Sequence, residues 1–163
     1  MKLQGNKIYL TSIEDKDTDL IVKWRNADFV MKNFIDKNPL TPEIHRNWLR
    51  NKVEKGLVYQ FVIHENETDR PIGSVYLRDV DCEDRSAEYG IFIGEEDALG
   101  FGFGTEACSM MNDFAKNELK LSKLRLRLRE ENKVAHKSYL KCGYEDTELV
   151  DGILFMERQL DEN

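Results

Sequence analysis

The residues best suited to bind a phosphate lie in the glycine-rich segment Gly100-Phe101-Gly102-Phe103-Gly104, which a helix-forming stretch follows at once. Glycines let backbone N–H groups turn toward one point and let a ligand approach the chain closely. At a helix N-terminus these donors and the helix dipole favour a phosphate or pyrophosphate. The segment therefore predicts a phosphate cradle, and a glycine turn without a ligand is the alternative.

This segment differs from two better-known nucleotide loops. No Gly-Lys-Ser/Thr follows it, so a Walker loop is excluded. The next predicted strand ends in arginine, whereas a dinucleotide fold uses an acid there to bind the ribose. An unrelated nucleotide-phosphate loop is a further alternative. It predicts protection of the protein by ATP or NAD but not by CoA.

A second group of residues, Asn132, Ala135 and Tyr139, stands at helical spacing after an alternating strand. Steps of three and four residues return to the same face of a helix, so the three side chains share one stripe. The small Ala135 leaves room for an extended ligand. The Asn132 amide can bind that ligand's own amides, and the Tyr139 hydroxyl can reach its far end. The alternatives are a helix cap for Asn132 and a half-buried packing residue for Tyr139.

With these two segments the chain resembles the GNAT superfamily of acetyl-CoA-dependent N-acetyltransferases. The resemblance covers nearly the whole chain and is strongest over residues 87–144. The family's pyrophosphate loop has the pattern Arg/Gln-x-x-Gly-x-Gly/Ala, and this chain has Leu99-Gly100-Phe101-Gly102-Phe103-Gly104, with leucine at the usually polar first position. The resemblance implies a single N-acetyltransferase domain over residues 1–163, with acetyl-CoA as the cosubstrate.

Two branches of the family share shorter motifs with the chain. Ala87-Glu88-Tyr89-Gly90 and Gly104-Thr105-Glu106-Ala107 are similar to ribosomal-protein alanine acetyltransferases. Lys23-Trp24-Arg25-Asn26, with His45 and Trp48, is similar to acetyltransferases of nucleotide-linked amino sugars. The implied acceptor is the primary amine of a small molecule, such as an amino sugar, or a peptide N-terminus. For Trp24 and Trp48, anchoring the first helices in the core is the favoured alternative.

The resemblance also implies where acetyl-CoA would lie, in a cleft between the strands at residues 86–93 and 123–129. Its pantetheine would extend the first strand through backbone hydrogen bonds, and its pyrophosphate would rest on the loop amides. The implied cofactor-binding residues are Ile91, Phe92, Ile93, Gly100, Phe101, Gly102, Phe103, Gly104, Thr105, Asn132, Ala135 and Tyr139.

Tyr139 and Glu88 are the candidate catalytic residues. A phenol near the departing sulfur can supply a proton or a hydrogen bond as the thiolate forms. Glu88 lies in an apolar strand, where partial burial would raise its pKa and make it a usable base for an ammonium group. Alternatively, Glu88 faces solvent or pairs with an arginine such as Arg78 or Arg85. Direct transfer is expected, because no thiol or hydroxyl has a neighbouring His–acid pair in the sequence.

Composition limits the remaining function classes. The chain has 163 residues and a formal net charge of −7, which opposes nonspecific binding to nucleic acid or to an anionic membrane. Three separated cysteines and three histidines show no metal-binding spacing, so no metal is expected. No apolar run suits a signal peptide or a membrane span, so the cytoplasm is expected. A homodimer is compatible with the sequence, and a noncatalytic CoA-binding or interaction module is the alternative function.

The elements that must position these residues follow from periodicity and turn signals. Strands and helices are mixed, with several hairpins, so the predicted class is α+β with a mixed, mostly antiparallel sheet flanked by helices. An Asp151-Gly152 turn is expected to join the last two strands. Strands are predicted over residues 7–13, 59–64, 71–79, 86–93, 123–129, 144–150 and 153–159; helices are predicted over 15–26, 41–55, 105–119 and 132–142.

Overall fold

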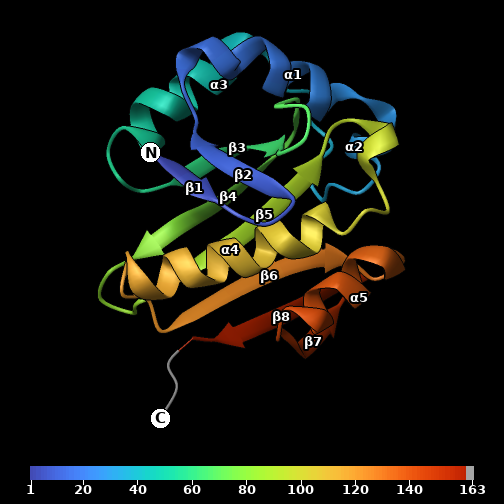
Figure 1. Ribbon diagram of the computed structural model, residues 1–163. Helices are drawn as coiled ribbons and strands as arrows, with labels where there is room; N and C mark the ends of the chain where they lie inside the picture. The colour runs from blue at the N-terminus through green and yellow to red at the C-terminus, as the bar shows by residue number, and fades with distance from the viewer. Residues whose placement is uncertain (161–163) are drawn as a thin grey trace.

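One eight-stranded sheet, in the order β1-β2-β3-β4-β5-β6-β8-β7, organises the chain in the computed structural model, which describes residues 1–160 (Figure 1). Every neighbouring pair is antiparallel except β5 and β6, which are parallel. The strands are β1 (Lys2–Gln4), β2 (Ile8–Ser12), β3 (Tyr59–Glu65), β4 (Pro71–Asp81), β5 (Ser86–Ile93), β6 (Lys123–Arg129), β7 (Glu145–Val150) and β8 (Ile153–Gln159). The α+β class with a mostly antiparallel sheet is confirmed.

Helices cover both faces of this sheet. One buried cluster joins one sheet face to α4 (Phe103–Asn117) and to the inner side of α5 (Lys133–Lys141). A second cluster joins the other face to α1 (Thr18–Asn26), to α2 (Asp28–Met31) and to the π-helical turn that follows α3 (Pro42–Trp48). Figure 1 shows α4 lying across the sheet, away from α1 and α3. The two faces can therefore supply different parts of one site.

The predicted elements are present, with small shifts at their ends. The first helix begins with a 3-10 turn over Asp15–Asp17, and α3 continues as a π-helical turn over Leu49–Val53. α4 begins at Phe103 rather than at residue 105, because Gly102 adopts a left-handed conformation and starts the helix. The sequence analysis missed β1 and α2, which are too short to show periodicity.

Two local predictions are confirmed in detail. Asp151 and Gly152 both have positive φ, 51° and 80°, as a tight hairpin turn of this type requires. Along β6, Leu124, Leu126 and Leu128 are buried in the core, so the arginines between them lie on the opposite face. Those arginines therefore face the side that α1 to α3 cover.

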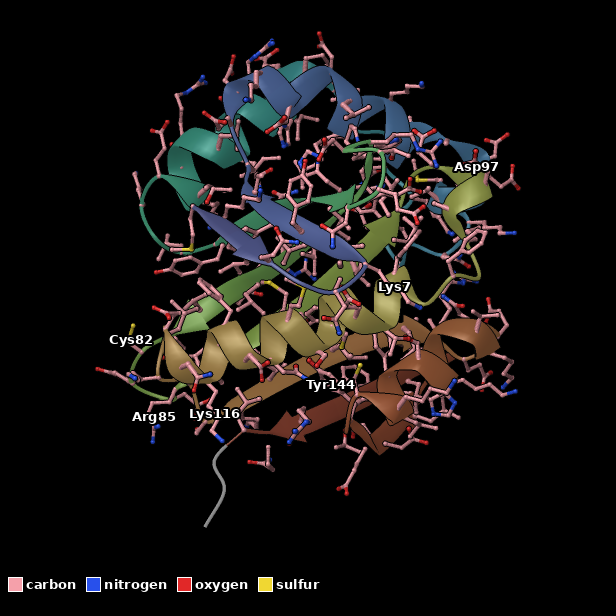
Figure 2. All side chains as sticks on the ribbon, in the orientation of Figure 1. Lys7, Cys82, Arg85, Asp97, Lys116 and Tyr144 are labelled. Atoms are coloured by element: carbon pink, nitrogen blue, oxygen red, sulfur yellow. The ribbon has the colours of Figure 1, made fainter. Side chains whose placement is uncertain are left out.

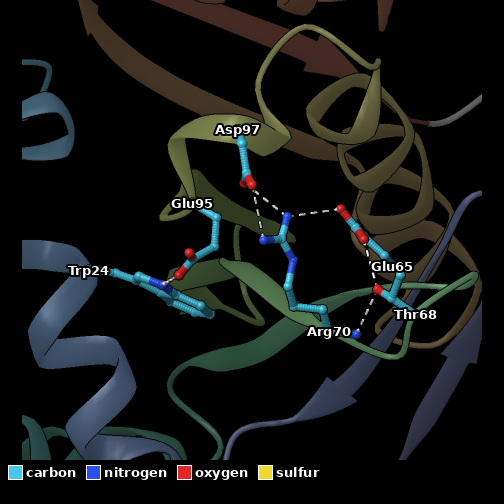
Figure 3. Close-up of polar contacts among 6 residues, drawn as sticks. All are labelled: Trp24, Glu65, Thr68, Arg70, Glu95 and Asp97. Carbon is cyan, nitrogen blue, oxygen red and sulfur yellow. Dashed lines mark hydrogen bonds and ion pairs between the residues drawn. The ribbon is translucent and has the colours of Figure 1, made fainter.

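Trp24 fastens α1 to the end of β5. Its side chain is 1% exposed, and its indole Nε1 donates a hydrogen bond to the Glu95 carboxylate at 2.6 Å (Figure 3). Its ring also covers Gly94, where an added Cβ would lie 2.1 Å from the Trp24 Cγ atom. Core anchoring is thus the observed role of Trp24. Close by, Arg70 bonds to Asp97 at 2.9 Å and fixes the segment that leads to the glycine loop.

We expect Gly94→Ala to destabilise the fold by about 1–3 kcal/mol, because the new methyl group must displace the base of a buried tryptophan. The matched control is Gly104→Ala, where the nearest atom to an added Cβ is 3.9 Å away. Urea unfolding of the two variants measures the difference. Equal free energies of unfolding would contradict the close packing of Trp24 on Gly94.

Candidate active site

The site is built where β5 and β6 separate. Their parallel pairing covers Ser86, Ala87 and Glu88, opposite residues 123–125, and no later pair forms in the described chain. From Tyr89 onward the backbone of β5 pairs with β4 on one side only. An extended ligand can therefore add to the free side of β5 by backbone hydrogen bonds.

A cavity of about 1240 Å³ opens at this separation and reaches residues from both sheet faces. Its walls include the carboxyl half of β5, the glycine loop, α5 and the N-terminal helices. Of the candidate residues predicted from the sequence, the structure brings together along this cavity Glu88, Ile91, Phe92, Ile93, Gly100, Gly102, Phe103, Gly104, Thr105, Asn132, Ala135 and Tyr139.

The glycine loop has the geometry that a phosphate cradle needs. Gly100 and Gly102 have φ of +86° and +82°, a region that side chains rarely adopt. Gly104 has ordinary helical geometry in the first turn of α4, and it leaves open space toward the cavity. The first N–H groups of α4 lack partners within the helix, so they are available to an anion.

Lys7 from the turn between β1 and β2 contacts this loop, as its labelled position in Figure 2 illustrates. Its ammonium nitrogen donates to the Phe101 carbonyl at 3.1 Å. The Glu106 carboxylate of α4 accepts the backbone N–H of Lys7 at 2.9 Å and that of Ile8 at 3.1 Å. The chain thus holds a cation beside the loop, although Leu99 leaves the loop itself without one. The sequence analysis missed Lys7, because 94 residues separate it from Phe101.

Phe101 is an exposed residue of the glycine loop. Its side chain is 57% exposed and lies outside the cavity lining, so the cofactor contact predicted for Phe101 stays a prediction. The positive φ values of Gly100 and Gly102 on either side turn it outward. Its ring stacks on Phe103 with centroids 5.8 Å apart, and Phe103 in turn packs on the core.

Asn132 caps α5, and it also lines the cavity. Its side-chain oxygen accepts the N–H of Ala135 at 3.3 Å. Within residues 1–160 its amide nitrogen makes no hydrogen bond. The cap therefore uses one end of the side chain and leaves the other end for a ligand.

Tyr139 lies one helical turn beyond Ala135, inside a cluster of tyrosines. Its ring meets Tyr89 edge-on at 6.1 Å and Tyr144 at 5.9 Å. Burial raises the pKa of the Tyr139 hydroxyl far above its ordinary value. At neutral pH the phenol therefore keeps its proton and is available as a hydrogen-bond donor.

Glu88 has two arginine partners, which overturns one expectation. Its carboxylate accepts hydrogen bonds from Arg78 Nε at 2.7 Å and from Arg127 Nε at 3.1 Å. Burial by itself raises the pKa of Glu88, but the hydrogen bonds and charges of Arg127 and Arg78 outweigh it and lower the pKa. The predicted raised pKa is wrong, and the alternative of an arginine partner is confirmed with Arg78. The second partner is Arg127 rather than Arg85.

Tyr76 and Arg25 complete the wall opposite α5, and Tyr76 was not predicted as a site residue. The Tyr76 ring lies on Gly90, where an added Cβ would be 2.3 Å from Tyr76 Cζ. Gly90 is the β5 residue paired with Tyr76, so only a glycine there admits the ring. A glycine inside a strand was the one signal that could have indicated this close approach.

Residues 1–160 contain no group of three or more His, Cys, Asp and Glu side chains placed to hold a metal ion. No helix in the same range has the length and apolar character needed to cross a membrane.

A mixed sheet that splits beside a glycine loop at a helix N-terminus defines a GNAT-type acyltransferase fold. The comparison with protein families agrees: residues 7–145 match the acetyltransferase (GNAT) domain family. The chain belongs to this family, and the resemblance found in its sequence is confirmed.

Among curated proteins, an uncharacterized protein of Methanocaldococcus jannaschii is 30% identical over 145 residues, which are 88% of this chain. The match spans 29% of that longer protein. A crystal structure of a domain from the same organism has a TM-score of 0.82 and 25% identity, covering 95% of this chain and 99% of that one.

A spermidine N-acetyltransferase from Vibrio cholerae, crystallised with CoA and spermine, has a TM-score of 0.85 at 20% identity. The match covers 96% of this chain and 97% of that one. At 20% identity, this similarity shows that the two proteins share a fold.

We expect Gly104→Val to weaken CoA binding by about tenfold or more, because the added side chain would project into the space before the first helical turn. Gly104 tests this better than Gly102, since a side chain at Gly102 would also strain the backbone. The control is Ser109→Val, at an exposed position of the same helix. Calorimetry with CoA measures both variants, and an unchanged affinity in folded Gly104→Val would rule out the cradle.

We expect Asn132→Ser and Asn132→Ala to separate the two uses of this side chain. Serine keeps a capping oxygen, whereas alanine loses the cap and about 1 kcal/mol of stability. Both variants lack the amide nitrogen, so both should raise the KM for acetyl-CoA. Thermal melts and kinetics on the pair distinguish the roles. A serine variant with the wild-type KM would leave Asn132 as a cap only.

Proposed function

We propose that this domain transfers the acetyl group of acetyl-CoA directly to a primary amine of a small molecule, such as an amino sugar, or to a peptide N-terminus. The separation of β5 from β6 beside the glycine loop carries the proposal. That geometry offers a free strand edge for an amide-bearing chain and a cluster of N–H donors for a pyrophosphate. Acetyl-CoA has both features.

In this proposal the pantetheine of acetyl-CoA lies along residues 91–93, and its pyrophosphate lies on the amides of residues 100–105. The first position of the loop is Leu99, which carries no charge. Lys7 supplies a positive charge instead, because its ammonium group already lies against the Phe101 carbonyl of the loop. The amide nitrogen of Asn132 meets the pantetheine amides, and the small Ala135 gives the chain room beside α5.

Tyr139 is the proposed proton donor to the departing sulfur. Its hydroxyl stays protonated because desolvation raises its pKa, and neighbouring tyrosine rings fix its position. The proton delivered to the thiolate hinders its return to the carbonyl, and the Tyr139 phenolate that remains regains a proton from solvent in the open cavity. In Glu88→Gln the arginine pairs would loosen, since a neutral amide cannot hold two guanidinium groups as a carboxylate does.

The acceptor must lose a proton before it can attack, because an ammonium has no free electron pair. We assign that proton to solvent reached through the open cavity. A carboxylate of lowered pKa that already binds two guanidinium groups is a weak base, so Glu88 is better suited to positioning Arg78 and Arg127.

One assay tests the proposed function. Release of free CoA thiol from acetyl-CoA is measured with a panel of amino sugars, polyamines and peptides, while calorimetry measures CoA binding alone. The proposal requires CoA binding and amine-dependent thiol release. CoA binding with no release from any amine would favour a noncatalytic CoA-binding module. Binding of ATP or NAD without CoA binding would favour an unrelated phosphate loop.

We expect Tyr139→Phe to lower kcat by about tenfold to a thousandfold, the range of a lost general acid, with CoA affinity intact. The phenyl ring keeps the packing against Tyr89 and Tyr144, so the fold should be retained. Single-turnover kinetics measure the chemical step itself. A wild-type rate in that measurement would leave Tyr139 as a packing residue.

A further inference from the structure

Arg25 is a half-buried cation on the acceptor side of the cavity, and no acidic side chain of residues 1–160 pairs with it. Its guanidinium carbon lies 3.8 Å from the centre of the Phe34 ring, and its Nη1 lies 3.8 Å from the Met31 sulfur. Within residues 1–160 it makes no ion pair, and Asp36 acts on it only through space. A partly desolvated charge is costly unless a group of opposite charge compensates for it.

Arg25 is also held in place before any ligand arrives. The neighbouring Asn26 side chain donates to the Leu40 carbonyl at 2.7 Å and accepts the Leu40 N–H at 2.9 Å. These two bonds fasten the segment after α2 to α1, and that segment carries Phe34. The guanidinium is therefore pre-oriented against a ring, which lowers the entropy lost when it binds a ligand.

The other arginines of this wall add to the positive charge. Arg78 and Arg127 share the one carboxylate of Glu88, and the other acid that Arg78 meets in the described part of the chain is Asp79, at 4.0 Å. Five basic and four acidic side chains line the cavity, so basic residues are in slight excess there. In the whole chain the excess is reversed, with 24 basic and 31 acidic residues. The cavity therefore does not share the acidity of the protein.

His45 provides an independent observation on the same wall. Its side chain is 3% exposed, and its Nδ1 lies 3.0 Å from the Thr18 hydroxyl. Its Nε2 is buried and has no hydrogen-bond partner in the described chain. A buried nitrogen needs a hydrogen-bond partner, and at the edge of the cavity a water or a polar group of the acceptor can supply it.

From these observations we infer that the acceptor amine also carries a phosphate or carboxylate group, which Arg25 binds as a charge-assisted pair beside His45. This inference rests on the proposed function and narrows its substrate class. Arginine suits both anions, because its planar fork can donate two parallel hydrogen bonds to their oxygens. A polycationic amine would instead be repelled by the three guanidinium groups of this wall.

The first test uses binding only, so that it does not depend on turnover. Inorganic phosphate is titrated into protein saturated with CoA, which occupies the glycine loop. We expect phosphate to bind, and Arg25→Gln to weaken that binding about tenfold or more without changing the affinity for CoA. Arg50→Gln removes the same charge from an exposed site outside the cavity and should have no effect. Equal phosphate binding by wild type and Arg25→Gln would overturn the inference.

The second test uses matched acceptors: glucosamine with glucosamine 6-phosphate, an Ala-Gln dipeptide amide with its Ala-Glu counterpart, and spermidine. The anionic member of one pair should have a kcat/KM about tenfold or more above its neutral partner, and Arg25→Gln should remove that preference. The acceptor pair that shows this preference identifies the anionic group as a phosphate or as a carboxylate. A uniform loss over all acceptors in Arg25→Gln, or spermidine as the best acceptor, would contradict the inference. Failure of CoA to bind would instead contradict the proposed function.

Discussion

The parting of two parallel strands is the constraint on which the rest of the molecule depends. β5 and β6 pair over only three residues, and then each continues with its other neighbour. Backbone groups freed in this way inside a sheet need partners. The cavity at the gap is where an amide-bearing chain can supply them, and the tyrosines of β5 and α5 fill the space on the α4 side.

This parting also lets the two sheet faces serve one reaction. The α4 and α5 face presents the glycine loop, the free end of Asn132 and the partly buried phenol of Tyr139. The opposite face presents Tyr76 and the arginines, beneath the helices that Trp24 fastens to the end of β5. Cofactor and acceptor can therefore approach from different faces and meet at the gap.

Glu88 illustrates how electrostatics can reverse an expectation based on burial. A carboxylate in an apolar strand should have a raised pKa if desolvation alone acts. Here the register of β4 and β5 places Arg78 opposite Glu88, and Arg127 reaches the same carboxylate from β6, so the two arginines outweigh the effect of burial. The same register gives the acceptor wall its positive character.

Much of the fold and part of the site could be predicted from local sequence. The alternation of β6, the Asp151-Gly152 turn, the glycine loop at the start of α4 and the stripe of Asn132, Ala135 and Tyr139 depend on neighbouring residues, so periodicity and turn chemistry were sufficient. Lys7 beside the loop, Tyr76 over Gly90 and the pairing of Glu88 with Arg127 join residues far apart in the chain. Only the tertiary structure decided these contacts, because strand order and register determine which distant side chains share a wall.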